Sequence, residues 1–240
     1  LATLADSATR LSLARREAAV TLVQKLDGEL QRLGMGGAGL AVGFVCDDDA
    51  EGPAVPLPDY ELVTAGVAPG EAGEPYARAV SEAGVDRVEF LASFNQGEAR
   101  RPLAAVSSGG ETSRFLLALT TVLGASAEPR IVVLDEVDEG VGGRAGALVG
   151  EALSRLAERH QVLCVTHLPQ VAAFGARHFV VRKLSDGSRT WSEVREVTGE
   201  DRVIELASML GGVGEANLGA ARELIAAAFA EDGARLPAGG

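Results

Sequence analysis

The chain has 240 residues, 47% of them hydrophobic and 23% charged, with a formal net charge of −12. This composition is typical of a globular protein and excludes a disordered chain. The negative charge argues against sequence-independent nucleic-acid binding by the chain as a whole, since Lys25 and Lys183 are its only lysines. Cys46 and Cys164 are far apart, which argues against a disulfide framework or zinc site and favours a reducing cytoplasm.

No apolar run has the length of a membrane span and no secretory leader is visible, so we expect no membrane partner. The first residue is Leu1 rather than Met, which favours a piece of a longer protein.

Apolar residues recur every three or four positions from Leu1 to Leu33, with charged residues mostly between them. A stripe of this length, with no turn signal before Gly34, predicts one long helix. We interpret it as the end of a coiled-coil arm over 1–34 that enters a globular head over 35–240. An ordinary amphipathic helix is the alternative.

The region 35–240 is predicted to be α/β. Strands are expected at 39–46, 61–67, 88–94, 131–134 and 162–166, and a Pro-rich acidic loop at 47–58 follows the first of them. Helices are expected at 76–83, 108–123, 144–159, 168–174, 200–210 and 215–230, with a hairpin of 179–183 and 190–197. The alternation of apolar runs and helical patterns predicts a mostly parallel sheet flanked by helices.

Four acidic residues follow a short apolar run in IVVLDEVDEGVGG at 131–143. The apolar run predicts a strand buried on both faces. Like charges about 4 Å apart repel by roughly 1 kcal/mol in water and roughly 4 kcal/mol at an effective dielectric of 20. We therefore expect a cation nearby, and Mg²⁺ carrying a polyphosphate is the natural candidate, with an acidic surface turn as the alternative. The four acids are Asp135, Glu136, Asp138 and Glu139.

A second stretch, VSSGGETSR at 106–114, begins a predicted helix. Ser108 and Glu111 fit a capping box, which would explain both residues. A cap does not explain Gly109 and Gly110, because each glycine costs a helix roughly 1 kcal/mol relative to Ala. Free N–H groups, a hydroxyl and little side-chain bulk would suit a terminal phosphate. Helix cap and phosphate site both stay open.

His167 follows the apolar run of VLCVTHLPQ at 162–170, next to Thr166 as an expected helix cap. A single histidine near a core is most often a packing residue. Ligands, however, bind at the carboxyl ends of strands in open α/β sheets, and the strand before Asp135 is expected in the same sheet. A ligand contact is therefore the second interpretation.

Three stretches together resemble one family. SSGGE at 107–111, IVVLDE at 131–136 with the VDEGVGG that follows, and VTH at 165–167 resemble the signature motif, Walker B, D-loop and switch histidine of ABC-type ATPases, in that order. NQGEARRPLAAVSSGGETSRFLLAL, DEVDEGVGG and QVLCVTHLPQVAA closely resemble the RecN family of bacterial SMC-like DNA repair ATPases. The resemblance implies the C-terminal lobe of an ABC-type ATPase head, preceded by the end of a coiled coil.

The resemblance also implies roles and cofactors, namely ATP and Mg²⁺. Asp135 would hold Mg²⁺, Glu136 would activate the attacking water as general base, and His167 would contact the γ-phosphate. Asp138 would cross an interface between two heads. The signature residues implied to bind the nucleotide of the opposing head are Ser108, Gly109, Gly110 and Glu111.

The phosphate-cradling motif G-x-x-x-x-G-K-[S/T] is absent from the sequence. In SMC-like proteins it lies in an N-terminal segment beyond a long coiled-coil arm, so this chain alone is expected to bind nucleotide poorly. The expected partners are that N-terminal half of the same head, a second head in an ATP-dependent homodimer and, by resemblance, DNA at double-strand breaks. The implied location is the cytoplasm, with the nucleoid.

Two other functions stay open. The chain could be a non-hydrolysing scaffold whose acidic loop docks a partner, or part of another SMC-like chromosome or recombination ATPase. One modest basic cluster is expected to be a solvated hairpin face rather than a DNA surface. Its members are Arg177, His178, Arg182, Lys183 and Arg189.

Overall fold

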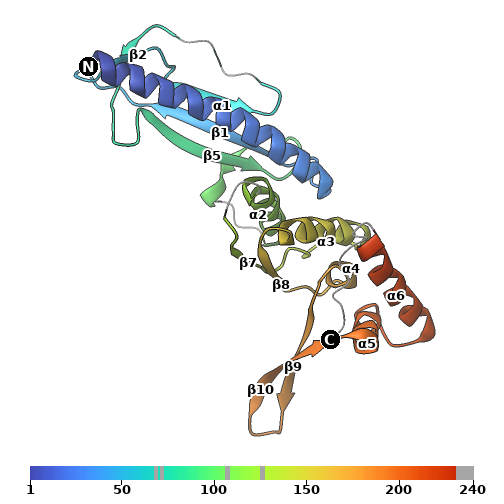
Figure 1. Cartoon of the computed structure of the whole chain (residues 1–240). Helices are drawn as coiled ribbons and strands as arrows, with labels where there is room; N and C mark the ends of the chain where they lie inside the picture. The colour runs from blue at the N-terminus through green and yellow to red at the C-terminus, as the bar shows by residue number, and fades with distance from the viewer. Residues whose placement is uncertain (68–69, 71–72, 106–108, 125–127, 231–240) are drawn as a thin grey trace. The chain divides into compact units, whose positions relative to one another are not determined.

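The computed structural model describes residues 1–67, 70, 73–105, 109–124 and 128–230. The chain forms two compact units, Leu1–Ser108 and Gly109–Gly240, each with its own helices and strands (Figure 1). Within the described ranges, none of the helices has the length and apolar character that crossing a membrane requires.

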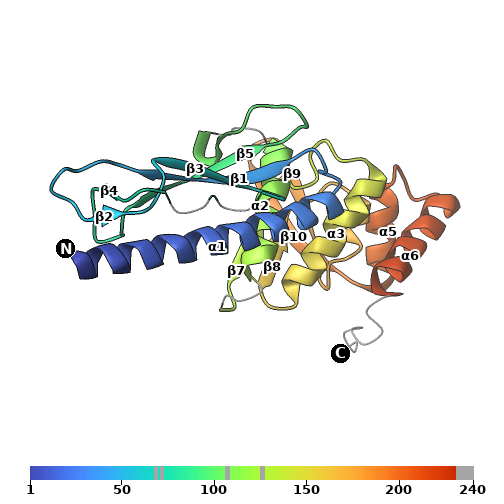
Figure 2. The same ribbon diagram turned by 90° about the horizontal axis from the view of Figure 1, so that it is seen from above.

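In the N-terminal unit a long helix, α1, runs along an antiparallel sheet of order β3-β1-β5-β6 (Figure 2). A smaller sheet pairs β2 with β4, and a 3₁₀ turn, η1, ends the unit. The bounds are α1 (Ala2–Arg32), β1 (Gly39–Cys46), β2 (Ala54–Val55), β3 (Tyr60–Thr64), β4 (Tyr76–Ala77), β5 (Asp86–Ser93), β6 (Arg101–Pro102) and η1 (Leu103–Ala105).

The predicted long helix is confirmed, and its buried stripe faces the sheet. Buried positions recur every three or four residues, the spacing that places them on one side of a helix. The helix contacts β1, β2 and β3. The interpretation of 1–34 as the end of a coiled-coil arm stays a prediction, as does the boundary at residue 34. The buried residues are Ala8, Ser12, Arg16, Ala19, Val23, Leu26 and Leu30.

A buried ionic cluster joins α1 to this sheet. The Arg16 guanidinium pairs with Glu61 of β3 and, at 2.9 Å, with Asp86 of β5. It also lies 4.5 Å from the ring centroid of Phe44 on β1. Ser12 donates to Asp86 at 2.6 Å. The charges are therefore paired where they leave water, as buried charges must be.

The helix predicted at 76–83 is wrong, because this segment makes strand β4 and a turn between Ser81 and Gly84. Long-range contacts override the local helical pattern. Arg78 is 1% exposed and donates to the carbonyl of Leu57 at 2.9 Å and to the carboxylate of Asp59.

The C-terminal unit contains the remaining elements. They are α2 (Gly109–Gly124), β7 (Ile131–Leu134), α3 (Gly143–Ala157), β8 (Gln161–Cys164), α4 (Pro169–Ala172), β9 (His178–Ser185), β10 (Thr190–Val197), α5 (Gly199–Met209) and α6 (Glu215–Ala230). The predicted hairpin is β9–β10, and the predicted pair of C-terminal helices is α5 and α6. Ala173 packs with apolar residues of α5 and α6 in a common core.

The predicted α/β class is confirmed, but parallel pairing is limited. Among the described strands only β7 and β8 pair in parallel, with α3 as the crossover helix, whereas the sheets of the N-terminal unit are antiparallel. β7 is also not buried on both faces in this chain, since Ile131 is 68% and Val133 69% exposed. The reason is that a pair of strands has few neighbours to cover it.

Candidate functional site

The acidic loop after β7 turns sharply at Glu136. Glu136 has φ of +58°, a left-handed conformation that residues other than glycine rarely adopt. Its N–H donates to Asp135 Oδ1 at 3.0 Å. The N–H of Glu139 donates to the Glu136 carbonyl at 3.1 Å and closes the turn. Strained backbone of this kind is concentrated at functional sites, and no residue pattern in the sequence indicates it.

The N-terminus of α2 abuts this loop. A methyl group on Gly109 would lie 2.3 Å from Glu139 Oε2 and 3.4 Å from Glu136 Oε2. A methyl group on Gly110 would lie 2.4 Å from the Glu139 carbonyl oxygen. Gly110 is therefore needed for close approach to the Glu139 backbone, whereas at Gly109 the nearest atom is the movable end of the Glu139 side chain. The phosphate site that the sequence suggests at these glycines stays a prediction. Ser108 lies outside the described residues, and Glu111 is half-buried in the first turn of α2.

A cation that the sequence reasoning missed holds α2 to the loop. Arg114 Nη1 donates to the carbonyl of Glu139 at 2.7 Å and is 3.5 Å from the carbonyl of Val137. Burial lowers the pKa of Arg114, while nearby carboxylates including Glu111 and Asp138 raise it. The pKa of arginine ordinarily lies so far above 7 that the guanidinium keeps its charge at neutral pH. Arg114 thus supplies part of the positive charge expected beside the four acids, and its place four residues after Gly110 was the available signal.

The carboxylate of Asp138 points into its own chain and binds the loop after β8. Its Oδ2 accepts the Thr166 hydroxyl, the N–H of His167 at 2.9 Å and the N–H of Leu168 at 3.2 Å. The His167 ring also approaches it, with Nδ1 at 3.3 Å. Because Asp138 is 2% exposed at its side chain and His167 69%, a buried acid orients an exposed imidazole.

Cys164, at the end of β8, is expected to keep its thiol protonated at neutral pH. Burial raises the pKa of its thiol to about 12, and the carboxylates of Asp138 and Asp135 add to this effect. The reactive form is the thiolate, so the thiol stays inert below that range.

The described residues contain no group of three or more His, Cys, Asp or Glu side chains arranged to hold a metal ion. Asp135 is exposed and its Oδ1 accepts the Glu136 N–H, which leaves Oδ2 as the oxygen that could hold a metal ion.

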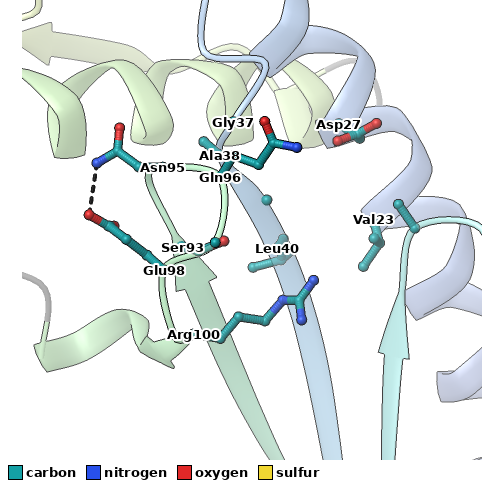
Figure 3. A pocket seen from close by; sticks show the side chains of 13 residues that line it. Val23, Asp27, Gly37, Ala38, Leu40, Ser93, Asn95, Gln96, Glu98 and Arg100 are labelled. Carbon is teal, nitrogen blue, oxygen red and sulfur yellow. Dashed lines mark hydrogen bonds between the residues drawn. The ribbon is translucent and has the colours of Figure 1, made fainter.

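The N-terminal unit has a separate polar pocket of about 360 Å³, at the start of β1 and the end of β5 (Figure 3). Asn95 donates to Glu98 at 2.9 Å on its rim, and Arg100 extends along it. Its lining contains none of the residues that the sequence predicted for a site.

Comparison with known proteins gives one consistent result, although no family model matches. The chain is 45% identical to the DNA repair protein RecN of Mycobacterium leprae over 94% of its length, 42% identical to that of Mycobacterium tuberculosis over 92%, and 46% identical to that of Deinococcus radiodurans over 78%. It covers 37%, 36% and 34% of those proteins, so it spans about a third of the relatives it matches.

Two solved structures are also similar at a coarse level. One, from work on ATP-driven dimerisation and DNA-stimulated activation of SMC ATPases, covers 53% of this chain and 76% of its own at 19% identity and a TM-score of 0.37. The other, an Smc head domain with a coiled coil and joint from Pyrococcus yayanosii, covers 78% of this chain and 28% of its own at 15% identity and a TM-score of 0.45. The resemblance to the RecN family that the motifs predict is confirmed by the sequence identity to these relatives, which extends over nearly the whole of this chain.

Proposed function

We propose that this chain is the C-terminal part of an SMC-like ATPase head that hydrolyses ATP with Mg²⁺ in DNA repair. One observation carries the proposal: the N-terminus of α2, the acidic loop after β7 and the histidine after β8 meet in one compact unit. These are the three stretches that match the family motifs, and they come from separate parts of the sequence. The similarity to RecN proteins supports the assignment to DNA repair.

Glu136 is the proposed general base. Its carboxylate is exposed and belongs to the loop that Gly109 approaches closely, where a phosphate and an attacking water can enter. Asp135 would hold Mg²⁺ through its available oxygen. When bound, that ion would neutralise charge on the phosphates, the main requirement of phosphoryl transfer. The left-handed backbone at Glu136 fixes the direction of the base.

His167 is the proposed phosphate contact. The exposed imidazole is held by Asp138 through both its ring and its backbone N–H, so its position is set before nucleotide binds. Asp138 serves this role within its own chain. A contact from its loop to a second head remains part of the proposal, carried by the exposed residues Glu139 and Gly140 rather than by the buried carboxylate.

The signature residues would bind the nucleotide of a second head. Gly109 is exposed at the N-terminus of α2, where backbone N–H groups lack helical partners and attract anions. Ser108 precedes it in the sequence, and Glu111 lies in the same first turn. A site shared between two heads would make hydrolysis depend on dimerisation.

The rest of the protein would complete the head. Ile131 and Val133 of β7 and Leu163 of β8 leave an apolar strand face exposed, at 68%, 69% and 49%. An exposed apolar face of this kind marks a contact surface. We propose that an N-terminal segment with the Walker A motif covers it. Leu4 and Leu11 on α1 are likewise exposed, at 45% and 41%, which supports continuation of this helix into a coiled-coil arm.

DNA is the proposed partner of the complete protein, in the cytoplasm with the nucleoid. The basic hairpin gives this little support, because Arg177 is paired with Glu196 at 2.6 Å. The prediction that this basic cluster is a solvated face of the hairpin stays a prediction. The surface that meets DNA would then lie outside this chain.

The test is ATP hydrolysis by this chain with and without the N-terminal part, and by the complete protein. We expect turnover only when both parts are present, and its loss in Glu136→Gln with nucleotide binding retained. Arg130→Gln, at an exposed side chain outside the site, is the matched control and should leave turnover unchanged. Turnover that persists in Glu136→Gln would remove this residue as base, and no turnover in the complete protein would favour a scaffold.

A further inference from the structure

The position of His167 depends on α4, a helix of one turn that begins two residues after it. A helix this short is not stable by itself, so its neighbours determine where it lies. Just before the N-terminus of α4, Asp138 accepts the N–H groups of His167 and Leu168. The segment therefore has one fixed end beside the proposed phosphate contact.

A guanidinium from outside every family motif holds the other end. Arg202 of α5 donates from Nη2 to the carbonyl of Ala173 at 2.8 Å and to that of Ala172 at 3.3 Å. These carbonyls lie at the end of α4, where a cation is favourable, and that of Ala172 also accepts the N–H of Gly175 at 3.2 Å. The guanidinium also lies 5.8 Å from the ring centroid of Phe229, so it joins α4 to α6 as well.

The third side of α4 is closed by glycines of α3. A methyl group on Gly146 would lie 3.1 Å from Leu168 Cδ1, and one on Gly150 would lie 2.3 Å from Phe174 Cδ2. Leu168 and Phe174 flank α4 on either side, so the helix rests directly on the α3 backbone. Any displacement of its end away from Arg202 would therefore change the loop that carries His167.

We propose that Arg202 is a positioning residue for His167, acting through α4 and opposite Asp138. The proposal rests on the proposed ATPase function and extends it to the C-terminal helices. Arg202 Nε is buried without a hydrogen-bond partner among the described residues, which costs stability. The two hydrogen bonds that Nη2 donates to α4 are therefore made while Nε goes without one. A residue kept only for packing would not need a charge there. The structural link runs from α5 and α6 through α4 to the imidazole.

The experiment compares Arg202→Gln and Arg202→Lys in the complete protein. We expect Gln to lower kcat about tenfold, because small displacements of a positioned group cost rate, while KM for ATP changes little. Lys keeps the cation and should restore part of kcat. Arg222→Gln is the matched control, since it breaks only an exposed pair with Glu200 at 2.7 Å, and it should keep wild-type kcat.

A second arm tests whether Arg202 acts through His167. In a His167→Ala background, Arg202→Gln should lower kcat no further, because the group it positions is gone. A full additional loss there would overturn the proposal, as would an unchanged kcat in Arg202→Gln alone.

Amide hydrogen exchange separates this proposal from the proposed function. Amides of 167–174 should exchange faster in Arg202→Gln than in Arg222→Gln, while those of α2 stay protected. If the complete wild-type protein hydrolyses no ATP, the function fails and exchange alone decides: faster exchange at 167–174 supports the positioning role of Arg202, and unchanged exchange overturns it. Should Arg202→Gln not fold, Arg202→Lys supplies the same comparison.

Discussion

The two units bury charge in different ways. In the N-terminal unit the Arg16 guanidinium meets two carboxylates, Glu61 and Asp86, so opposite charges are paired. In the C-terminal unit the buried carboxylate of Asp138 is held by neutral donors, a hydroxyl and two backbone N–H groups. The ionisable ring that approaches it, that of His167, is exposed. The first arrangement joins a helix to a sheet, whereas the second orients a side chain toward solvent.

The comparison predicts the largest loss of stability for Arg16→Met. Removing one partner of a buried ionic cluster leaves Asp86 without its main counter-charge and costs about 3–5 kcal/mol. Urea unfolding of the chain measures this free energy. Arg10→Met breaks only an exposed pair with Asp6 on the same helix and should cost under about 1 kcal/mol. Equal losses in the two variants would contradict the comparison.

A smaller loss is expected for Asp138→Asn. The amide keeps the shape but replaces an acceptor facing three donors, so unfolding should become easier by about 1–3 kcal/mol. Turnover of the complete protein should fall as well, because His167 loses its anchor. Thr166→Val removes one donor and keeps the carboxylate, so its cost should be nearer ~1 kcal/mol. A larger effect for Thr166→Val would argue that the hydroxyl, rather than the acid, organises the loop.

Two replacements of glycine by alanine should change the free energy of unfolding in opposite directions. Gly110→Ala forces a methyl group against the backbone of Glu139 and should destabilise the C-terminal unit by about 1–3 kcal/mol. Gly28→Ala lies within α1, where nothing is within 4 Å of the new methyl group, and should stabilise by up to about 1 kcal/mol. Thermal unfolding of both variants decides. Stabilisation by Gly110→Ala would show that α2 does not need close approach to the acidic loop.

The smallest expected effect is on the rates at which the two cysteine thiols react. Burial raises the pKa of Cys46, with Asp86 adding to it, and raises that of Cys164 to about 12. Because a raised thiol pKa favours the protonated folded state, the stability that Cys164 contributes is complete below about pH 9 and is lost toward pH 12. Both thiols should therefore react slowly with iodoacetamide at about pH 8. Arg16→Met should slow Cys46 further, because the guanidinium lowers the pKa of that thiol, whereas Asp138→Asn should speed Cys164; the reverse pattern would contradict the assignment.

The sequence predicted those features that depend on local pattern. The long stripe of α1 and the hairpin of 179–183 and 190–197 depend on patterns within a few residues, and the structure has both where they were expected. The failed helix at 76–83 involves distant partners, since Arg78 turns a helical pattern into β4 through residues 19 to 30 positions away. The inward direction of the Asp138 carboxylate likewise depends on donors 28 to 30 positions later.

The sequence names residues of the candidate site but not the contacts between them. Family motifs indicated Glu136 and His167, but not the guanidinium of Arg114 on the loop or that of Arg202 on α4. The place of Arg114 four residues after Gly110 was a signal for its contact, whereas no spacing reveals the target of Arg202. The uncovered face of β7 also could not be foreseen, because the apolar run is the same whether or not this chain supplies its cover.

The left-handed backbone at Glu136 lowers the stability of the fold at the same position that carries the proposed general base. A left-handed conformation costs a residue with a side chain roughly 1–2 kcal/mol, a penalty that glycine avoids. Selection for thermal stability alone would thus enrich glycine at 136 and discard the proposed base. Directed evolution of this protein for robustness would therefore remove the proposed base unless ATP turnover is selected in the same round.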